Sequence, residues 1–153
     1  MSAAISAPPF QIRPANAGDA AYVLHSWRSS FAYSKRADLQ AYDEDLYFFL
    51  MARFVQRLFK DKGTDIVVAC NPADPGTVIG FAVLTGPELH YVYVRKGLRG
   101  YGVARALLAG RDVKTYSFET DQFLEHFKPA SRGWTHVPRE EQSPSGKFRL
   151  EMG

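Results

Sequence analysis

The segment from Glu88 to Leu108 constrains the fold of this chain more than any other. The run Glu-Leu-His-Tyr-Val-Tyr-Val at 88–94 predicts a strand, and Arg99-Gly-Tyr-Gly-Val-Ala104 follows four residues later and opens a predicted helix. The first backbone N–H groups of a helix have no partner within the helix and lie at the positive end of its dipole. The sequence therefore predicts an α/β domain with an anion-binding turn at the end of a strand.

The glycines and arginines of this turn suit a phosphate group. Gly100 and Gly102 lack the Cβ atoms that would keep phosphate oxygens away from the backbone, and Arg99 and Arg105 add positive charge. Arg105 also stands where a dinucleotide-binding motif has its third glycine, and no Lys-Ser or Lys-Thr pair follows as in a nucleotide P-loop. Those two classes are not favoured. Taken alone, the turn is also compatible with a flexible connection.

The rest of the chain predicts a disordered tail at residues 1–9 and a single domain at 10–153. Tyr22, Val23 and Trp27 form one apolar helical stripe, and a second helix carries apolar residues at intervals of three or four. That second stripe consists of Leu46, Phe49, Leu50, Phe54 and Leu58. The predicted strands are 10–13, 65–69, 77–84, 88–94, 113–118, 134–137 and 147–152. The predicted helices begin near residue 19, run from a cap at Asp43 to Gly63, follow the turn as far as 110, and cover 121–127.

Composition narrows the class of protein. A net charge of +3 over 153 residues is too mild to indicate nucleic acid, although Arg95, Lys96, Arg99, Arg105 and Arg111 gather in one short stretch. The single cysteine, Cys70, can form no internal disulfide, which favours a reducing cytoplasm. No signal peptide or membrane span is expected, and a homodimer is compatible with the sequence.

The run from Glu88 to Leu108 resembles the acyl-CoA-binding core of the GNAT superfamily of N-acetyltransferases. That family uses Arg or Gln, two free positions, Gly, one free position and then Gly or Ala, and Arg99, Gly102 and Ala104 fill this pattern. Gly133-Trp134 and the segment 147–152 are similar to the start of the family's sixth strand and to its last strand. The resemblance implies a central mixed, mostly antiparallel sheet of about six to seven strands flanked by about four helices.

The same resemblance implies a cofactor site and a reaction. Acetyl-CoA would be the cosubstrate, no metal would be needed, and the acetyl group would pass to a primary amine by direct attack. The pantetheine arm of acetyl-CoA would meet backbone groups at 92–94, and its pyrophosphate would lie on the turn. The substitutions Arg99→Ala and Gly102→Val would therefore weaken acetyl-CoA binding. The implied cofactor-binding residues are Val92, Tyr93, Val94, Arg99, Gly100, Tyr101, Gly102, Val103, Ala104 and Arg105.

The reaction needs a base, because freeing the lone pair of an amine with a pKa near 10.4 at pH 7 costs roughly 4 to 5 kcal/mol. The resemblance makes Glu88 the candidate base, and a solvated strand-end carboxylate is the alternative reading. Many family members use a tyrosine to reprotonate the thiolate, but the segment 123–127 has none. His126 and Tyr116 could replace that tyrosine as the acid. The alternative is that His126 is a surface residue and Tyr116 a packed aromatic of a strand. His90 could line the acceptor groove or be a buried, hydrogen-bonded residue.

The acceptor and two other functions stay open. In the family, the segments corresponding to 26–45 and 139–146 select the acceptor, and nothing here separates a protein amine from a small polyamine, aminoglycoside or amino acid. One alternative is a catalytically silent acyl-CoA-binding sensor or interaction module. A weaker alternative is a surface for single-stranded nucleic acid.

Overall fold

The computed structural model describes residues 9–32, 44–117 and 121–137. Most of the predicted tail, the predicted cap Asp43, the acceptor segment 139–146 and the predicted strand 147–152 lie outside these ranges.

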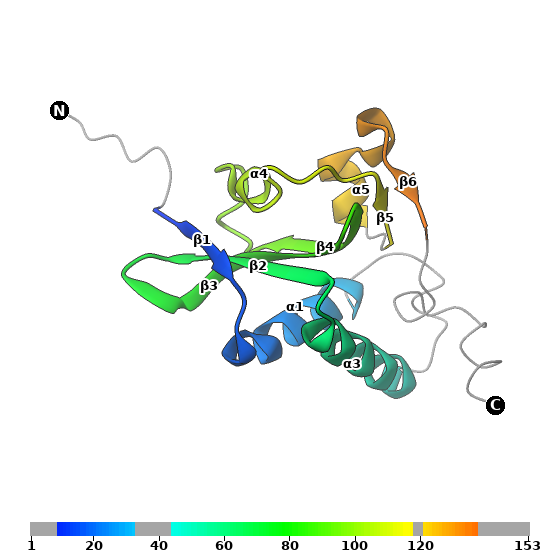
Figure 1. Ribbon diagram of the computed structural model, residues 1–153, viewed down its shortest axis with the longest axis horizontal. Helices are drawn as coiled ribbons and strands as arrows, with labels where there is room; N and C mark the ends of the chain where they lie inside the picture. Colours follow the sequence, from blue (N-terminus) through cyan, green and yellow to red (C-terminus); the bar gives the residue numbers. More distant parts are fainter. Residues whose placement is uncertain (1–8, 33–43, 118–120, 138–153) are drawn as a thin grey trace.

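One six-stranded mixed sheet forms the centre of the molecule, with its strands in sequence order (Figure 1). The first four strands are antiparallel neighbours, whereas the fifth and sixth each pair in parallel with the strand before. The strands are β1 Gln11–Pro14, β2 Thr64–Asn71, β3 Asp74–Thr85, β4 Glu88–Val94, β5 Thr115–Tyr116 and β6 Thr135–His136.

Helices cover both faces of the sheet. The helices α1 (Ala20–Ala32) and α3 (Glu44–Lys60) lie together on one face, and α4 (Val103–Leu107) and α5 (Asp121–Phe127) lie on the other (Figure 1). Short 3-10 turns, η1 at Ala17–Asp19 and η2 at Pro129–Arg132, precede α1 and follow α5. The predicted fold class, a mixed sheet of about six strands flanked by about four helices, is confirmed.

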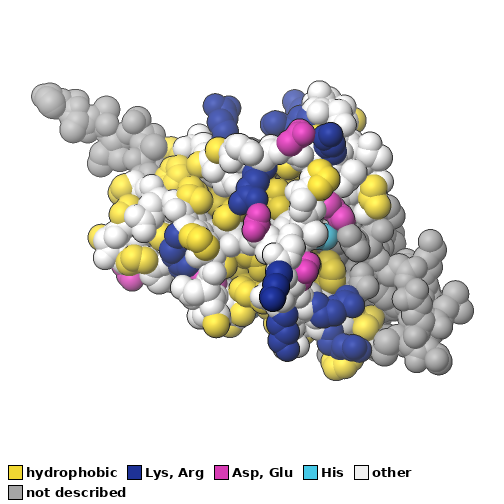
Figure 2. All heavy atoms as spheres, viewed as in Figure 1, with side chains coloured by type: hydrophobic (Ala, Val, Ile, Leu, Met, Phe, Trp, Pro, Cys, Tyr) yellow, Lys and Arg dark blue, Asp and Glu magenta, His cyan; other side chains and the backbone are white. Residues whose placement is uncertain are grey.

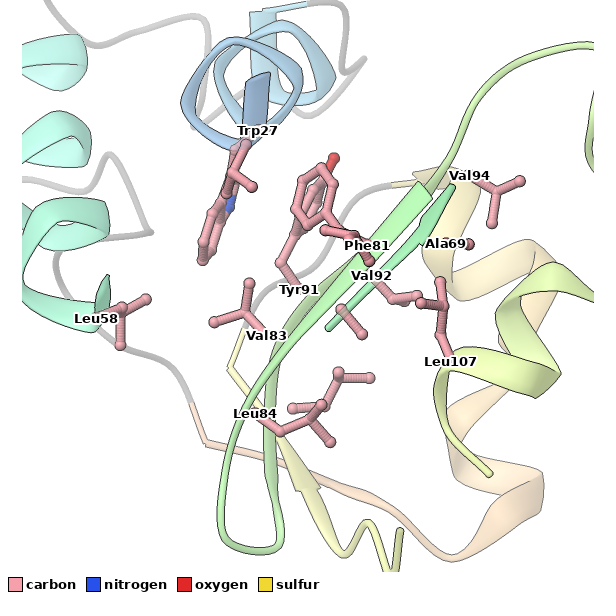
Figure 3. Packing of buried hydrophobic residues seen from close by; sticks show 14 of the residues in the cluster. Trp27, Leu58, Ala69, Phe81, Val83, Leu84, Tyr91, Val92, Val94 and Leu107 are labelled. Atoms are coloured by element: carbon pink, nitrogen blue, oxygen red, sulfur yellow. The ribbon is translucent and has the colours of Figure 1, made fainter. Parts of the chain in front are cut away.

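The core between the sheet and α1 is built on aromatic rings. Trp27 is fully buried and stacks on Tyr91 at 4.8 Å, and its edge meets Phe54 of α3 at 5.8 Å. Val92 and Leu107 pack on the opposite side of the sheet (Figure 3). Strand β4 therefore lies between two packed layers, as expected for a central strand.

The predicted apolar stripes are confirmed at most of the positions whose side chains the structure describes, and the side chain of Leu46 lies outside that part of the chain. Val23 and Trp27 on α1, and Leu50, Phe54 and Leu58 on α3, are buried. Phe49 was expected to be buried, but 54% of it is exposed, and the Arg53 guanidinium lies over its ring at 5.8 Å. The arginine covers part of an apolar ring that the sheet does not reach.

An ion pair attaches β1 to the start of the first helix. Both guanidinium nitrogens of Arg13 donate to Asp19, at 2.8 and 3.0 Å, and Asp19 also accepts the Asn16 backbone N–H at 2.8 Å. Asp19 is only 5% exposed, and these bonds hold the pKa of its carboxyl below the ordinary value, chiefly through Arg13. The charge on Asp19 therefore stabilises the folded state.

Three predicted boundaries were wrong. The helix after the turn ends at Leu107 rather than near 110, because Gly110 adopts a φ of +76° that a right-handed helix cannot continue. The hairpin turn is only Pro72-Ala73, since β3 already begins at Asp74. Strand β5 covers two residues of the predicted 113–118, of which residue 118 lies outside the described ranges.

Candidate functional site

Strands β4 and β5 separate shortly after they begin to pair. Their register joins Glu88 to Thr115 and Leu89 to Tyr116, and among the described residues the Ser117 N–H to Leu89 carbonyl bond of 3.1 Å is the last between them. On the β3 side, the register steps from Leu84–Leu89 to Val83–Tyr91, so His90 is an extra residue in β4. Past Leu89, no strand of the described chain pairs with the β5 side of β4.

Backbone groups of β4 are directed along this open edge. The Val94 carbonyl accepts the Arg99 Nε–H at 2.8 Å, whereas the next N–H, that of Arg95, bonds back toward β3 at the Ile79 carbonyl. Because backbone groups in a strand alternate between its two sides, Val92 shares the orientation of Val94. The backbone N–H and C=O of Val92 therefore lie on the edge that β5 leaves open.

A cleft of about 1050 Å³ lies beside this edge, between β4, the glycine turn, α4 and α5. Tyr101 is the one predicted cofactor-binding residue that does not line it, and its side chain is 43% exposed. The other nine line the cleft together, namely Val92, Tyr93, Val94, Arg99, Gly100, Gly102, Val103, Ala104 and Arg105.

The glycines of the turn are required by its backbone conformation. Gly97, Gly100 and Gly102 have φ values of +91°, +87° and +84°, in the left-handed region that other residues rarely adopt. A Cβ atom at any of the three would meet no atom within 4 Å. The turn is thus shaped by left-handed glycines and leaves open space beside its backbone.

Arg99 is held in place by the strand that precedes it. Its Nε–H bond to Val94 occupies one side of the guanidinium, and its Cζ lies 5.8 Å from the centre of the Tyr93 ring. Burial raises the pKa of Tyr93, Tyr22 raises it further, and Arg99 and Arg95 oppose the shift. The side chain of Arg99 is therefore directed before any ligand binds.

The basic lining of the cleft differs from the basic stretch in the sequence. Arg95 and Lys96 do not line the cleft, and the Arg95 guanidinium bonds the Val78 carbonyl at 2.9 Å. Lys128 and Arg132, which follow α5, do line it. They were not identified from the sequence alone because they are far from the turn along the chain. The cationic side chains of the cleft are Arg99, Arg105, Arg111, Lys128 and Arg132, against Asp112 and Glu125. Figure 2 shows Lys and Arg side chains over this side of the molecule and also along α3.

An aromatic wall forms the side of the cleft opposite the turn. Phe123 and Phe127 of α5 stack at 5.1 Å, and Phe127 lies 6.3 Å from Trp134 at a shallow angle. Arg132 is fixed against this wall by a 2.7 Å bond from its Nε–H to the Phe127 carbonyl and by its position 5.6 Å over Trp134. The cleft thus joins an apolar wall to a cationic rim.

Two of the three predicted catalytic residues, Glu88 and Tyr116, lie outside the lining of the cleft. Glu88 lies outside its lining, with a side chain 14% exposed and Oε2 3.6 Å from His90 Nδ1. Tyr116 is buried, stacks on His136 at 5.0 Å and does not line the cleft, so its position favours the packed-aromatic reading. His126 belongs to α5, but its side chain lies outside what the structure describes.

The described ranges contain neither a candidate membrane span nor a candidate metal site. No helix there is long and apolar enough to cross a membrane. No group of three or more His, Cys, Asp or Glu side chains there is placed to hold a metal ion.

No protein-family model and no curated protein matches the sequence. Solved structures do match the fold. The apo form of YjaB from Escherichia coli is 18% identical, with 79% of this chain and 80% of that chain covered at a TM-score of 0.56. A candidate acetyl transferase from Pyrococcus furiosus is 17% identical, with 95% and 92% covered at a TM-score of 0.52. The chain therefore shares its fold with these two proteins, one of which is described as an acetyl transferase.

Proposed function

We propose that this protein is an N-acetyltransferase that moves an acetyl group from acetyl-CoA to a primary amine. The observation that carries the proposal is the cleft between the open edge of β4 and the left-handed glycine turn. The likeness to solved structures supports the fold, and the chemistry of the cleft supports the ligand.

The lining of the cleft fits each part of an acyl-CoA molecule. The open edge at Val92 offers backbone groups to the amides of a pantetheine arm, as a neighbouring strand would. The turn from Arg99 to Ala104 and the five cationic side chains offer N–H groups and positive charge to phosphates. Bound acetyl-CoA supplies an activated thioester, and the chain itself supplies position and charge.

The proposed reaction is direct attack by the neutral amine. Its lone pair forms a bond to the thioester carbonyl carbon, the carbon–sulfur bond breaks, and the electron pair leaves on the thiolate. Glu88 takes the proton that the amine nitrogen gives up. A CoA thiol has an ordinary thiol pKa of about 8.5, so the thiolate is a competent leaving group beside a cationic rim without a dedicated acid.

Release of free thiol tests the proposal. Wild-type protein is incubated with acetyl-CoA and a panel containing a polyamine, an aminoglycoside, an amino acid and a peptide with a free N-terminus. Thiol release above hydrolysis with at least one amine, and its loss in Glu88→Gln but not in Asp74→Asn, an exposed carboxylate outside the cleft, is the expected result. Saturable binding of acetyl-CoA with no thiol release from a broad amine panel would instead identify a silent acyl-CoA-binding module.

A further inference from the structure

The buried histidine of β4 has polar contacts at both ring nitrogens. His90 is 2% exposed, its Nε2 lies 2.8 Å from Thr85 Oγ1, and its Nδ1 lies 3.2 Å from Ser117 Oγ. Glu88 Oε2 is 3.6 Å from the same Nδ1. The Nδ1 of His90 is therefore next to the carboxylate that the proposed reaction uses as a base.

Two threonines connect this histidine to the protein surface. Thr85 Oγ1 lies 2.7 Å from Thr64 Oγ1 on the neighbouring strand β2, and the Thr64 hydroxyl donates to Asp61 Oδ2 at 2.7 Å. Asp61 is exposed and lies in the turn between α3 and β2. A continuous chain of side-chain hydrogen bonds thus runs from His90 to a surface carboxylate.

The donor and the acceptor of every hydrogen bond in this chain follow from the carboxylate of Asp61 at its surface end. An ionised carboxylate only accepts, and a threonine hydroxyl has one proton to donate. Thr64 gives its proton to Asp61, so its oxygen must accept from Thr85, and the Thr85 oxygen must in turn accept from His90. The chain therefore requires a proton on Nε2 of His90 and leaves Nδ1 as the basic nitrogen of the neutral ring.

The surroundings favour the ionised state of Asp61. The Thr64 hydroxyl, and next the Gly63 N–H at 3.2 Å, lower the pKa of the Asp61 carboxyl below its ordinary value, so it is ionised at neutral pH. Of the carboxylates near His90, Glu88 on β4 lies 3.6 Å from its Nδ1, and Asp61 is linked to its Nε2 through the two threonines. Helix α3 adds the Phe54 ring edge at 5.8 Å, with the Arg57 guanidinium over that ring.

We propose that Asp61, Thr64 and Thr85 hold His90 in its Nε2–H form, so that Glu88 and the Nδ1 of His90 act as one coupled base. In this arrangement Glu88 receives the amine proton and shares it with Nδ1, and the resulting imidazolium lies between Glu88 and the chain that ends at Asp61. His90 and the three residues behind it are positioning residues. This inference rests on the proposed function for its role in turnover, but not for the tautomer itself.

The tautomer is measured by nitrogen NMR on the whole chain without any ligand. In the neutral ring, the signal of wild-type His90 should show a protonated Nε2 and an unprotonated Nδ1, and Thr85→Val should shift the population toward Nδ1–H. Thr85→Ser keeps the hydroxyl and should restore the wild-type pattern. A wild-type His90 with its proton on Nδ1 would overturn the inference, whether or not the protein transfers acetyl groups.

The use of the chain in turnover is measured by the pH dependence of kcat/KM. Thr85→Val should lower the plateau about tenfold or more and move its acidic limb to lower pH, because the imidazolium loses its hydrogen bond to the chain that ends at Asp61. Asp61→Asn keeps an oxygen that can accept from Thr64 but removes the negative charge. It should therefore move the acidic limb of the pH profile to lower pH and leave the His90 tautomer unchanged. It also lies on an exposed turn, so it remains informative if Thr85→Val does not fold.

Thr77→Val is the matched control. The Thr77 hydroxyl donates to Asp74 Oδ2 at 2.7 Å on the surface of β3, the same bond type as that between Thr64 and Asp61, without a link to His90. It should change neither the tautomer nor the pH profile. Active protein whose pH profile is the same in Thr85→Val, Asp61→Asn and Thr77→Val would show that the chain is structural only.

Discussion

The Arg99 side chain, which lines the cleft, is oriented by two contacts within the protein. Its Nε–H donates to the Val94 carbonyl at 2.8 Å and its Cζ lies 5.8 Å from the centre of the Tyr93 ring, and both contacts restrict its rotamers. A ligand phosphate then pays little additional ordering cost. The sequence motif identified the residue, but the strand end that fixes its direction is visible only in the fold.

Replacing this side chain should weaken ligand binding without unfolding the protein. Arg99→Ala should lower the affinity for acetyl-CoA about tenfold or more, because a charge-assisted bond is lost. Calorimetry measures the change, and Arg53→Ala, an exposed arginine stacked on Phe49 of α3, is the matched control. Equal affinities in the two variants would remove Arg99 from the site.

Asp19 is the residue whose charge should matter most for stability. Asp19→Asn should lower the free energy of unfolding at pH 7 by about 1.5 to 3 kcal/mol, because it breaks the charge-assisted bonds to Arg13. Asp65→Asn removes an ion pair to Arg111 in which the carboxylate is 61% exposed, and should cost less than about 1 kcal/mol. Urea unfolding of both variants decides between these values.

The pH dependence of this effect has a definite sign. The folded-state pKa of Asp19 is lowered, so its stabilising contribution is complete above the ordinary value of about 3.9 and is lost as the pH falls toward the folded value. The difference between wild type and Asp19→Asn should therefore shrink below about pH 4. A difference that is constant from pH 7 to pH 3 would contradict this account.

At the scale of elements, the site depends on how closely β3 approaches β4. An added Cβ at Gly80 would lie 2.5 Å from the Tyr93 carbonyl oxygen, in the backbone that lines the cleft. Gly80→Ala should therefore push the strands apart and cost about 1 to 3 kcal/mol. Gly76→Ala, on the exposed start of the same strand, meets nothing closer than 3.7 Å and should be close to neutral in the same unfolding measurement.

The turn between β4 and α4 makes a separate prediction. Gly102→Ala and Gly86→Ala both place a side chain at a positive φ in open space, so each should cost about 1 to 2 kcal/mol of stability. Only Gly102 lies in the cleft, so only Gly102→Ala should also weaken acetyl-CoA binding. Similar binding by the two variants would show that the conformation of this turn has no part in holding the ligand.

Across the whole molecule, the sequence predicted local elements such as strands and helices. It did not predict which residues far apart in sequence lie together in the fold. The bounds 88–94 and 121–127 agree with the sequence, because alternation and helical spacing are set by neighbouring residues. Lys128 and Arg132 line the cleft together with residues of β4, although α4, β5 and α5 separate them from β4 in the sequence. The chain from His90 to Asp61 likewise crosses three strands, and no spacing in the sequence records it.

The central claim is that the open edge of β4 and the glycine turn bind acetyl-CoA. Hydrogen–deuterium exchange with and without saturating acetyl-CoA tests it most directly, because it reports on individual backbone amides. Bound acetyl-CoA should slow exchange at Val92, Val94 and the turn from Arg99 to Ala104, with little change in the β1–β2 pair. Unchanged exchange at β4 and the turn, with protection confined to another face of the sheet, would contradict this claim.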